Sequence, residues 1–187
     1  MRLHDFGILD GISEVIATTI SKDGRPNAAP IGIISDDIMH VRLYPDTHTY
    51  SNIKATKKLV ANVVNDPFLF MLSALGDLGE RGFYVVDGLP VLRCADAWAS
   101  FECEEDKRDS TLIHLHLVRG KVIRKRVRAI NRGANAVIEA TVHATRYAAT
   151  KDEKYLEWIA HYEGVVKKCG GAREKEAMKK LREFLKK

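Results

Sequence analysis

The chain has 187 residues, of which 45% are hydrophobic and 29% are charged, a composition typical of a globular protein with one domain or one domain plus an appendage. No apolar run approaches the roughly 18 residues of a membrane-spanning helix, and the first eleven residues lack the apolar core of a signal peptide, so we expect a cytoplasmic protein. The three cysteines, an odd number without the spacing of a metal site, favour a reducing compartment without disulfides.

The net charge of +5 is unevenly spread along the chain. Residues 1–128 hold 17 Lys and Arg against 17 Asp and Glu, whereas residues 129–187 hold 13 against 8. The whole excess therefore lies in the last third. Helices with mixed Lys and Glu on a solvated face give the same pattern, so it is weak evidence for a nucleic-acid partner.

The first strands form a hairpin. Residues 12–20 are rich in β-branched side chains, Asp23-Gly24 is a strong turn signal, and residues 29–34 are again apolar. Pro30 cannot donate to a ladder and indicates an edge or a bulge. Gly32 indicates either a bulged barrel corner or a place where a ligand approaches the backbone.

The next segment predicts a strand at residues 38–44, a polar loop at 45–52, a short helix at 53–58 and a strand at 59–64. The loop is crowded with hydroxyl, imidazole and amide groups, and Arg42 precedes it on the strand. Such donors beside a helix start suit an anion, and we interpret the loop as a phosphate site. The alternative is simply a capped helix start, with Thr49 or Ser51 as the N-cap.

The middle of the chain continues as strands. Residues 68–75 are consistent with a helix or a strand, and short strands are predicted at 84–86, 91–94 and 97–104. Residues 112–124 alternate most cleanly. They place His114 and His116 on one face, a spacing that can ligate a metal; because no third ligand is near in sequence, we predict no metal site.

From about residue 129 the spacing of apolar residues becomes helical. Three helices are predicted, with a stop at Cys169-Gly170-Gly171. The predicted fold is therefore mainly β with α: a barrel of six or more strands over residues 1–128, followed by a helical extension of about three helices over residues 129–187.

Four segments of this chain follow one another in an order that resembles the order of motifs in the FMN-binding split-barrel proteins, particularly the flavin reductase and flavoredoxin-like branch. They are residues 49–56 (TYSNIKAT), Asn62-Val63, residues 99–103 (ASFEC), and the strand running to Gly120. The resemblance covers roughly residues 8–128. The whole chain is most similar to a small family of unknown function that adds a helical tail to this barrel.

The resemblance implies a flavin mononucleotide (FMN) cofactor and a homodimer with FMN at the subunit interface. It implies an oxidoreductase or an electron-transfer or hydride-transfer protein, with no assigned catalytic residue. A nicotinamide or deazaflavin, whose phosphates the basic run at residues 119–128 would bind, is a possible substrate. Carried over residue by residue, the resemblance places the isoalloxazine at Ala29, Pro30, Ile31 and Gly32. It places the phosphate at Arg42, Thr47, His48, Thr49, Tyr50, Ser51 and Asn52, and the polar edge of the flavin at Asn62.

A second hypothesis rests on the basic run at residues 119–128 (RGKVIRKRVR). As a cationic stripe on a strand, it would bind nucleic acid or a phospho-ligand without catalysis. The run lacks aromatic side chains for base stacking, which makes nucleic acid an unlikely partner. Among the cysteines, Cys103 lies between Glu102 and Glu104, and we expect these acids to raise its pKa and make it a poor nucleophile.

Overall fold

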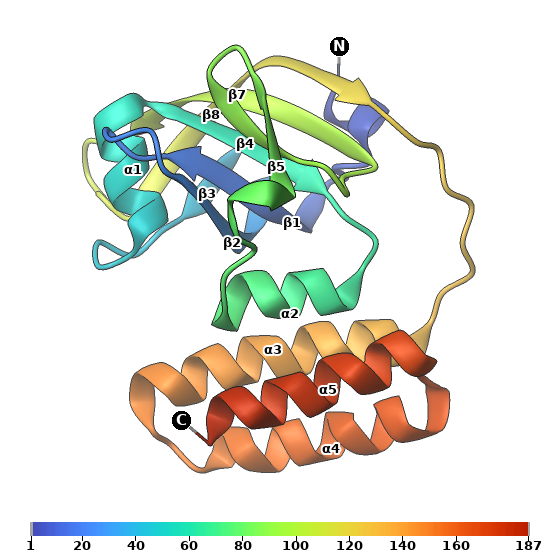
Figure 1. Ribbon diagram of the computed structural model, residues 1–187. Coiled ribbons are helices and arrows are strands. Elements are labelled where there is room, and N and C mark those ends of the chain that lie inside the picture. The colour runs from blue at the N-terminus through green and yellow to red at the C-terminus, as the bar shows by residue number, and fades with distance from the viewer. Residues whose placement is uncertain (1, 187) are drawn as a thin grey trace. The chain divides into compact units, whose positions relative to one another are not determined.

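The computed structural model describes residues 2–186. The chain forms two compact units: a barrel unit, which holds the chain up to Asn65 together with Gly79–Arg126, and a helical unit, which holds Asp66–Leu78 and the chain from Val127 onward. Figure 1 shows both units, with the chain coloured from its N-terminus to its C-terminus. Each described helix is too short or too polar to span a bilayer.

The barrel unit contains a closed six-stranded antiparallel barrel, which confirms the predicted fold class. Its strand order is β1-β2-β3-β8-β7-β4. The barrel strands are β1 (Gly11–Ile20), β2 (Pro26–Ser35), β3 (His40–Arg42), β4 (Lys58–Val63), β7 (Ala97–Glu105) and β8 (Leu112–Val122). The remaining elements of this unit are η1 (Leu3–Phe6), α1 (His48–Thr56), η2 (Glu80–Gly82), β5 (Phe83–Val86) and β6 (Leu89–Leu92).

The β-branched and apolar residues that alternate along these strands fill the barrel interior. Ile33, Val41 and Leu59 are completely buried. Pro30 pairs with Ile16 of β1, and β2 meets β3 at Ile34, near the other end of the strand. The missing N–H of Pro30 therefore falls where β2 has an edge, as the sequence predicted.

Gly120 lies where the barrel is tightest. A Cβ at this position would be 2.5 Å from the carbonyl oxygen of Trp98 and 2.7 Å from the ring of Phe6. No side chain fits such a space, because real Cβ atoms keep more than 3 Å from their neighbours. A register shift at Ser100 and Phe101 bends β7 against β8 close by.

The hairpin of β5 and β6 covers part of the outer face of the barrel. Val91 of the hairpin packs with Val60 and Trp98 in a small separate cluster. The hydroxyl of Thr18 donates a hydrogen bond to the carbonyl of Pro90. The strand predicted at residues 91–94 thus lies two residues earlier. Strand β3 is shorter at both ends than the strand predicted at residues 38–44, although the N–H of Leu43 still donates to the carbonyl of Thr111 at 2.8 Å.

The helical unit contains four helices. They are α2 (Pro67–Leu75), α3 (Arg132–Thr150), α4 (Lys154–Cys169) and α5 (Ala172–Leu185). Residues 68–75 are thus helical, and Met71 packs in one apolar cluster with residues of α3, α4 and α5. Asp66 caps α2 and forms an ion pair of 3.0 Å with Arg173 of α5, so the unit is assembled from two distant parts of the chain.

Candidate functional site

Helix α1 begins earlier than predicted. Thr47 is its N-cap: the hydroxyl accepts a hydrogen bond from the backbone N–H of Tyr50 at 3.2 Å and donates to the carbonyl of Tyr44 at 2.8 Å. The expected loop at residues 48–52 is therefore helix, and the expectation of Thr49 or Ser51 as the cap was wrong. Thr47 satisfies an N–H of the first turn, which leaves the later hydroxyls available for other contacts.

The inner face of α1 is tied to the ends of β1 and β2. Thr49 and Asn52 are buried, with 3% and 8% of their surface exposed. Thr49 accepts a hydrogen bond from the amide of Asn27 at 3.0 Å, and the amide of Asn52 donates to the hydroxyl of Thr19 at 3.0 Å. These two residues hold the helix in place against the barrel.

The outer face of α1 carries His48 and Ser51, both exposed. At the first turn of any helix the leading backbone N–H groups have no acceptor within the helix, and the helix dipole favours negative charge there. The imidazole, the hydroxyl and the N–H groups of this first turn together form a set of donors suited to a phosphate.

Tyr50 and Lys54 lie along α1 and both contact Glu105, the last residue of β7. The Tyr50 hydroxyl donates to one carboxylate oxygen at 3.2 Å, and the Lys54 ammonium donates to the other at 2.6 Å. The hydrogen bond between Lys54 and Glu105 is the main reason that the pKa of Lys54 is raised and the pKa of Glu105 is lowered. Glu105 therefore positions both side chains relative to the barrel.

Arg42 is exposed, and its guanidinium is held by the turn before β8. It donates to Thr111 at 2.9 Å and to the carboxylate of Asp109 at 3.3 Å. The hydroxyl of Thr111 also donates to Asp109, which is the largest cause of the lowered pKa of that carboxyl. The charge of Arg42 is thus partly neutralised by a carboxylate.

The segment Ala29 to Gly32 divides between two faces of β2. Ile31 lies in the barrel core, and Ala29, two residues earlier on the strand, lies on the same inner face. Pro30 and Gly32 alternate to the outer face, where a Cβ at Gly32 would be 2.8 Å from the side chain of Ile12. A flat ring on this face would contact Pro30, and over Gly32 it would meet the side chains of Ile12 and Glu14 before the backbone.

Asn62 is completely buried, and its amide is engaged inside the protein. It donates to the carbonyl of Ile16 at 2.9 Å and to the hydroxyl of Thr18 at 3.0 Å, and it accepts from the N–H of Leu92 at 2.9 Å. The amide thereby joins β1, β4 and β6. These partners are distant in sequence, so no local pattern indicated this role, and we leave Asn62 out of the proposed cofactor contacts.

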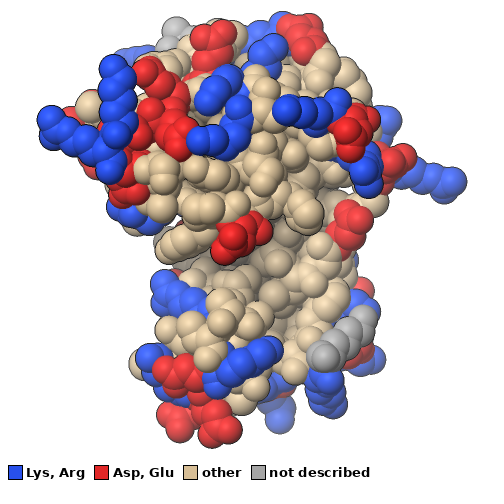
Figure 2. Space-filling model, turned by 90° about the vertical axis from the view of Figure 1, so that its left-hand side faces the viewer, with Lys and Arg blue, Asp and Glu red and all other residues tan. Residues whose placement is uncertain are grey.

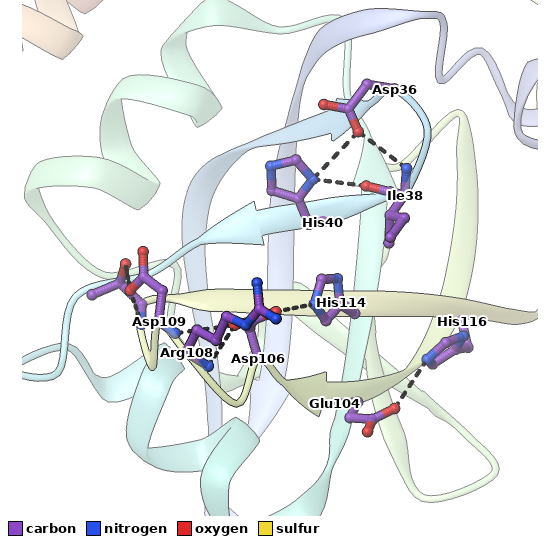
Figure 3. Close-up of polar contacts among 10 residues, drawn as sticks. Asp36, Ile38, His40, Glu104, Asp106, Arg108, Asp109, His114 and His116 are labelled. Carbon is purple, nitrogen blue, oxygen red and sulfur yellow. Dashed lines mark hydrogen bonds and ion pairs between the residues drawn. The ribbon is translucent and has the colours of Figure 1, made fainter.

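A groove of about 450 Å³ lies on the outer face of β7 and β8. His114 of β8 lies opposite His40 of β3 on one side and opposite Glu104 of β7 on the other, so the three residues form one row across the sheet. Figure 3 shows how the imidazoles face carboxylates: His114 lies 2.9 Å from Asp106, and His116 lies 3.6 Å from Glu104. The contact with His114 is the largest of several that lower the pKa of Asp106 to about 2.

The arrangement in this groove is one of imidazole–carboxylate contacts. Each imidazole is turned to its own carboxylate, so the donor atoms do not converge on one point. Within residues 2–186, no group of three His, Cys, Asp or Glu side chains is arranged to hold a metal ion.

The basic run at residues 119–128 is only partly strand, because β8 ends at Val122. Arg119 pairs with Asp87 and lies over the Trp98 ring. Arg124 and Arg126 both pair with the buried carboxylate of Asp96, at 3.2 and 2.9 Å. The expected cationic stripe is therefore wrong for residues 123–128. Figure 2 shows Lys and Arg interspersed with Asp and Glu on the face of the molecule that it draws.

Cys103 is 6% exposed and packs in the barrel core. Burial raises the pKa of its thiol to about 12. The predicted direction was right, but the predicted cause was wrong: Glu102 and Glu104 alternate to the exposed face of β7.

Two family models match this chain. One, described as "Protein of unknown function (DUF447) N-terminal domain", matches residues 13–126; the other, "Protein of unknown function (DUF447)", matches residues 131–183. The chain belongs to the DUF447 family. An uncharacterized protein from Methanocaldococcus jannaschii is 30% identical over 189 residues, which covers 88% of this chain and 93% of that protein.

Solved structures extend the comparison. An FMN-bound protein of the DUF447 family from Methanosarcina mazei is 46% identical, with a TM-score of 0.92 over 98% of this chain and 100% of that one. The flavoredoxin of Desulfovibrio vulgaris is 14% identical, with a TM-score of 0.51 over 68% of this chain and 79% of that one. This distant similarity shows a shared fold, and the predicted resemblance to a split-barrel family with a helical extension is confirmed.

Proposed function

We propose that this chain is an FMN-binding flavoprotein that transfers electrons or hydride. The observation that carries the proposal is the FMN-bound structure from Methanosarcina mazei, which is 46% identical and matches 98% of this chain. Among related chains of this identity and coverage, the fold and its main ligand site are usually shared. The barrel unit also offers groups that fit the cofactor.

The phosphate of FMN fits the outer face of the start of α1. His48, Ser51 and the N–H groups of the first turn supply donors, and each hydrogen bond to a charged phosphate contributes on the order of 1.5–3 kcal/mol. The isoalloxazine fits the outer face of β2 at Pro30, next to the side chains of Ile12 and Glu14 that lie over Gly32. In this proposal Thr49, Asn52 and Glu105 position α1 and do not contact FMN.

Bound FMN would supply the redox chemistry, because a flavin accepts and donates electrons singly or in pairs. The residues of this chain would bind the phosphate, orient the ring and limit access of water to it. We assign no catalytic acid or base. A homodimer with FMN at the subunit interface is a proposal from the family resemblance, and a nicotinamide or deazaflavin substrate is a proposal from the basic run at residues 119–128.

A fluorescence titration of FMN into the apoprotein tests the phosphate site. We expect His48→Ala combined with Ser51→Ala to weaken FMN binding at least tenfold, because two direct donors are lost. The matched control is His161→Ala combined with Thr145→Ala, which removes the same kinds of group from the helical unit. Equal affinity in both double variants would refute this phosphate site while leaving FMN binding itself intact.

The alternative function, binding of nucleic acid or a phospho-ligand through residues 119–128, has less support. Arg119, Arg124 and Arg126 are engaged by the carboxylates of Asp87 and Asp96. A guanidinium held by a nearby carboxylate attracts a phosphate less strongly than an unpaired one.

A further inference from the structure

The outer face of β1 is buried at one end and exposed at the other. Because Val15 and Ala17 point into the barrel core, the residues that alternate with them lie on the outer face: Ile12, Glu14, Ile16 and Thr18. Ile16 and Thr18 are buried, and Thr18 donates a hydrogen bond to Pro90 of the hairpin formed by β5 and β6. At the other end Glu14 is exposed, and Ile12 is 67% exposed.

Strand β2 leads along this face from helix α1 towards Glu14. Asn27 of β2 donates a hydrogen bond to Thr49 of α1 at 3.0 Å, so this end of the strand is tied to the helix of the proposed phosphate site. A rise of about 3.3 Å per residue places Pro30 about 10 Å and Gly32 about 17 Å further along the strand. Gly32 pairs with Glu14 of β1. A ring at Pro30 would therefore extend from the α1 end of β2 towards the Glu14 side chain.

The carboxylate of Glu14 lies over the backbone of β2. A Cβ at Gly32 would be 3.4 Å from Oε1 of Glu14 and 2.8 Å from Cγ2 of Ile12. The missing side chain at Gly32 thus leaves the space that these two side chains occupy, two residues from Pro30 on the same face. Because an exposed glutamate carries a negative charge at neutral pH, this charge lies at one edge of the proposed ring position.

A charge beside a flavin changes how readily the ring accepts electrons. Reduction adds an electron pair to the ring, and with one added proton the reduced ring carries a negative charge that the oxidised ring lacks. A neighbouring carboxylate repels this charge, and the repulsion is stronger where water is excluded. The apolar side chains of Ile12 and Pro30 would exclude water from the ring beside Glu14. The oxidised form is therefore favoured relative to the reduced form.

We propose that the carboxylate of Glu14 lies beside the isoalloxazine of bound FMN and makes the flavin harder to reduce. This inference rests on the proposed function, because it requires the ring of FMN on the outer face of β2. Glu14 acts through its charge alone and transfers no proton. Once reduced, the bound cofactor is then a stronger electron donor than the same cofactor without the carboxylate beside it.

The test is an anaerobic titration of the full-length protein, saturated with FMN, with dithionite and a redox dye that reports the potential. At the potential where half of the wild-type flavin is reduced, Glu14→Gln should raise the ratio of reduced to oxidised flavin about threefold or more. Glu14→Lys reverses the charge and should raise the ratio about tenfold or more. Glu14→Asp keeps the charge and should stay within about twofold of the wild type. Added salt should reduce the differences, because it screens an exposed charge.

The matched control is Glu102→Gln, which removes the same charge from an exposed position of β7. Two strands separate β7 from β2 in either direction around the barrel, so the control should change the ratio by less than about twofold. An unchanged or lower ratio in Glu14→Gln, or an equal rise in Glu102→Gln, would overturn this inference while FMN binding itself stands. A wild-type protein that takes up no FMN would instead refute the proposed function, and this inference with it.

Discussion

The two units of this protein differ in how they satisfy their buried polar side chains. In the barrel unit such groups join separate elements: Asn62 connects three strands, Asn52 of α1 binds Thr19 of β1, and Thr18 binds Pro90. In the helical unit, Ser73 and Thr141 donate to carbonyls of their own helices. Apolar packing and the surface ion pairs Asp66–Arg173 and Glu163–Arg182 hold the helices together, while the barrel unit adds buried polar links between its elements.

The difference bears on where a ligand site can be built. Polar links fix α1 against β1 and β2, so the donors on its outer face are held in place by the hydrogen bonds of its inner face. A precise site requires such support, because contacts misplaced by about 1 Å lose much of their value. In the helical unit the charged groups lie on surface side chains instead.

The largest expected effect is the loss of a core side chain from the helical unit. Leu181 is completely buried, and Leu181→Ala should destabilise the unit by about 3 kcal/mol, through lost burial and a residual cavity. The two tryptophans provide unit-specific probes, since Trp98 lies in the barrel unit and Trp158 in the helical unit. Urea unfolding followed by Trp158 in a Trp98→Phe background measures the change; the exposed control Lys179→Ala should shift it by less than about 0.5 kcal/mol.

The second prediction contrasts the two kinds of buried polar group. Asn62→Leu should cost about 2 kcal/mol or more, because it leaves the N–H of Leu92 and the carbonyl of Ile16 buried without their partner. Thr141→Val removes a hydroxyl bonded to its own helix and should cost less than about 1 kcal/mol. Chemical denaturation of both variants compares them, and equal losses would contradict the distinction between the units.

The third prediction concerns the cap of α1. Thr47→Ala removes the acceptor of the Tyr50 N–H and should lower the free energy of unfolding by about 1 kcal/mol. Ser51→Ala, in the exposed part of the same helix, should be nearly neutral, because alanine is a strong helix former. If Ser51→Ala were instead the more destabilising of the two, the cap would be misassigned.

The smallest effect is a dependence of stability on pH in the acid range. The folded-state pKa of Asp106 is lowered to about 2 from an ordinary value of 3.8. A lowered pKa stabilises the folded state above the ordinary value, so this contribution is fully present above about pH 4 and is lost as the pH falls towards 2. Asp106→Asn should flatten the slope of stability against pH between 4 and 2, and an unchanged slope would contradict this assignment.

Much of the barrel could be predicted from local pattern. The alternation of β-branched residues placed β1 and β4 within one residue of their observed bounds and β2 within three, and the helical spacing after residue 129 placed α3 to α5. The local sequence did not identify the N-cap of α1, because several neighbouring residues have a side chain suited to that position. Three aliphatic hydroxyls, of Thr47, Thr49 and Ser51, lie close together in the sequence, and only the three-dimensional structure shows that Thr47 caps α1 while Thr49 binds Asn27.

Other features depend on partners that are distant in sequence. Asn62 seemed suited to a ligand because its sequence position matched a family pattern, but its partners come from residues 16, 18 and 92. Arg42 likewise finds Asp109, which is 67 positions away. The association of α2 with the C-terminal helices also arises from tertiary packing, since an apolar stretch of nine residues does not reveal which core it joins.

The central claim is that this chain binds FMN, and an absorbance spectrum tests it most directly. The purified protein is scanned from the near-ultraviolet to the visible, and its supernatant is scanned again after heat denaturation. We predict the two flavin bands in the native protein and their complete release into the supernatant, as expected for a non-covalent flavin. A colourless protein that also fails to take up added FMN would contradict the account.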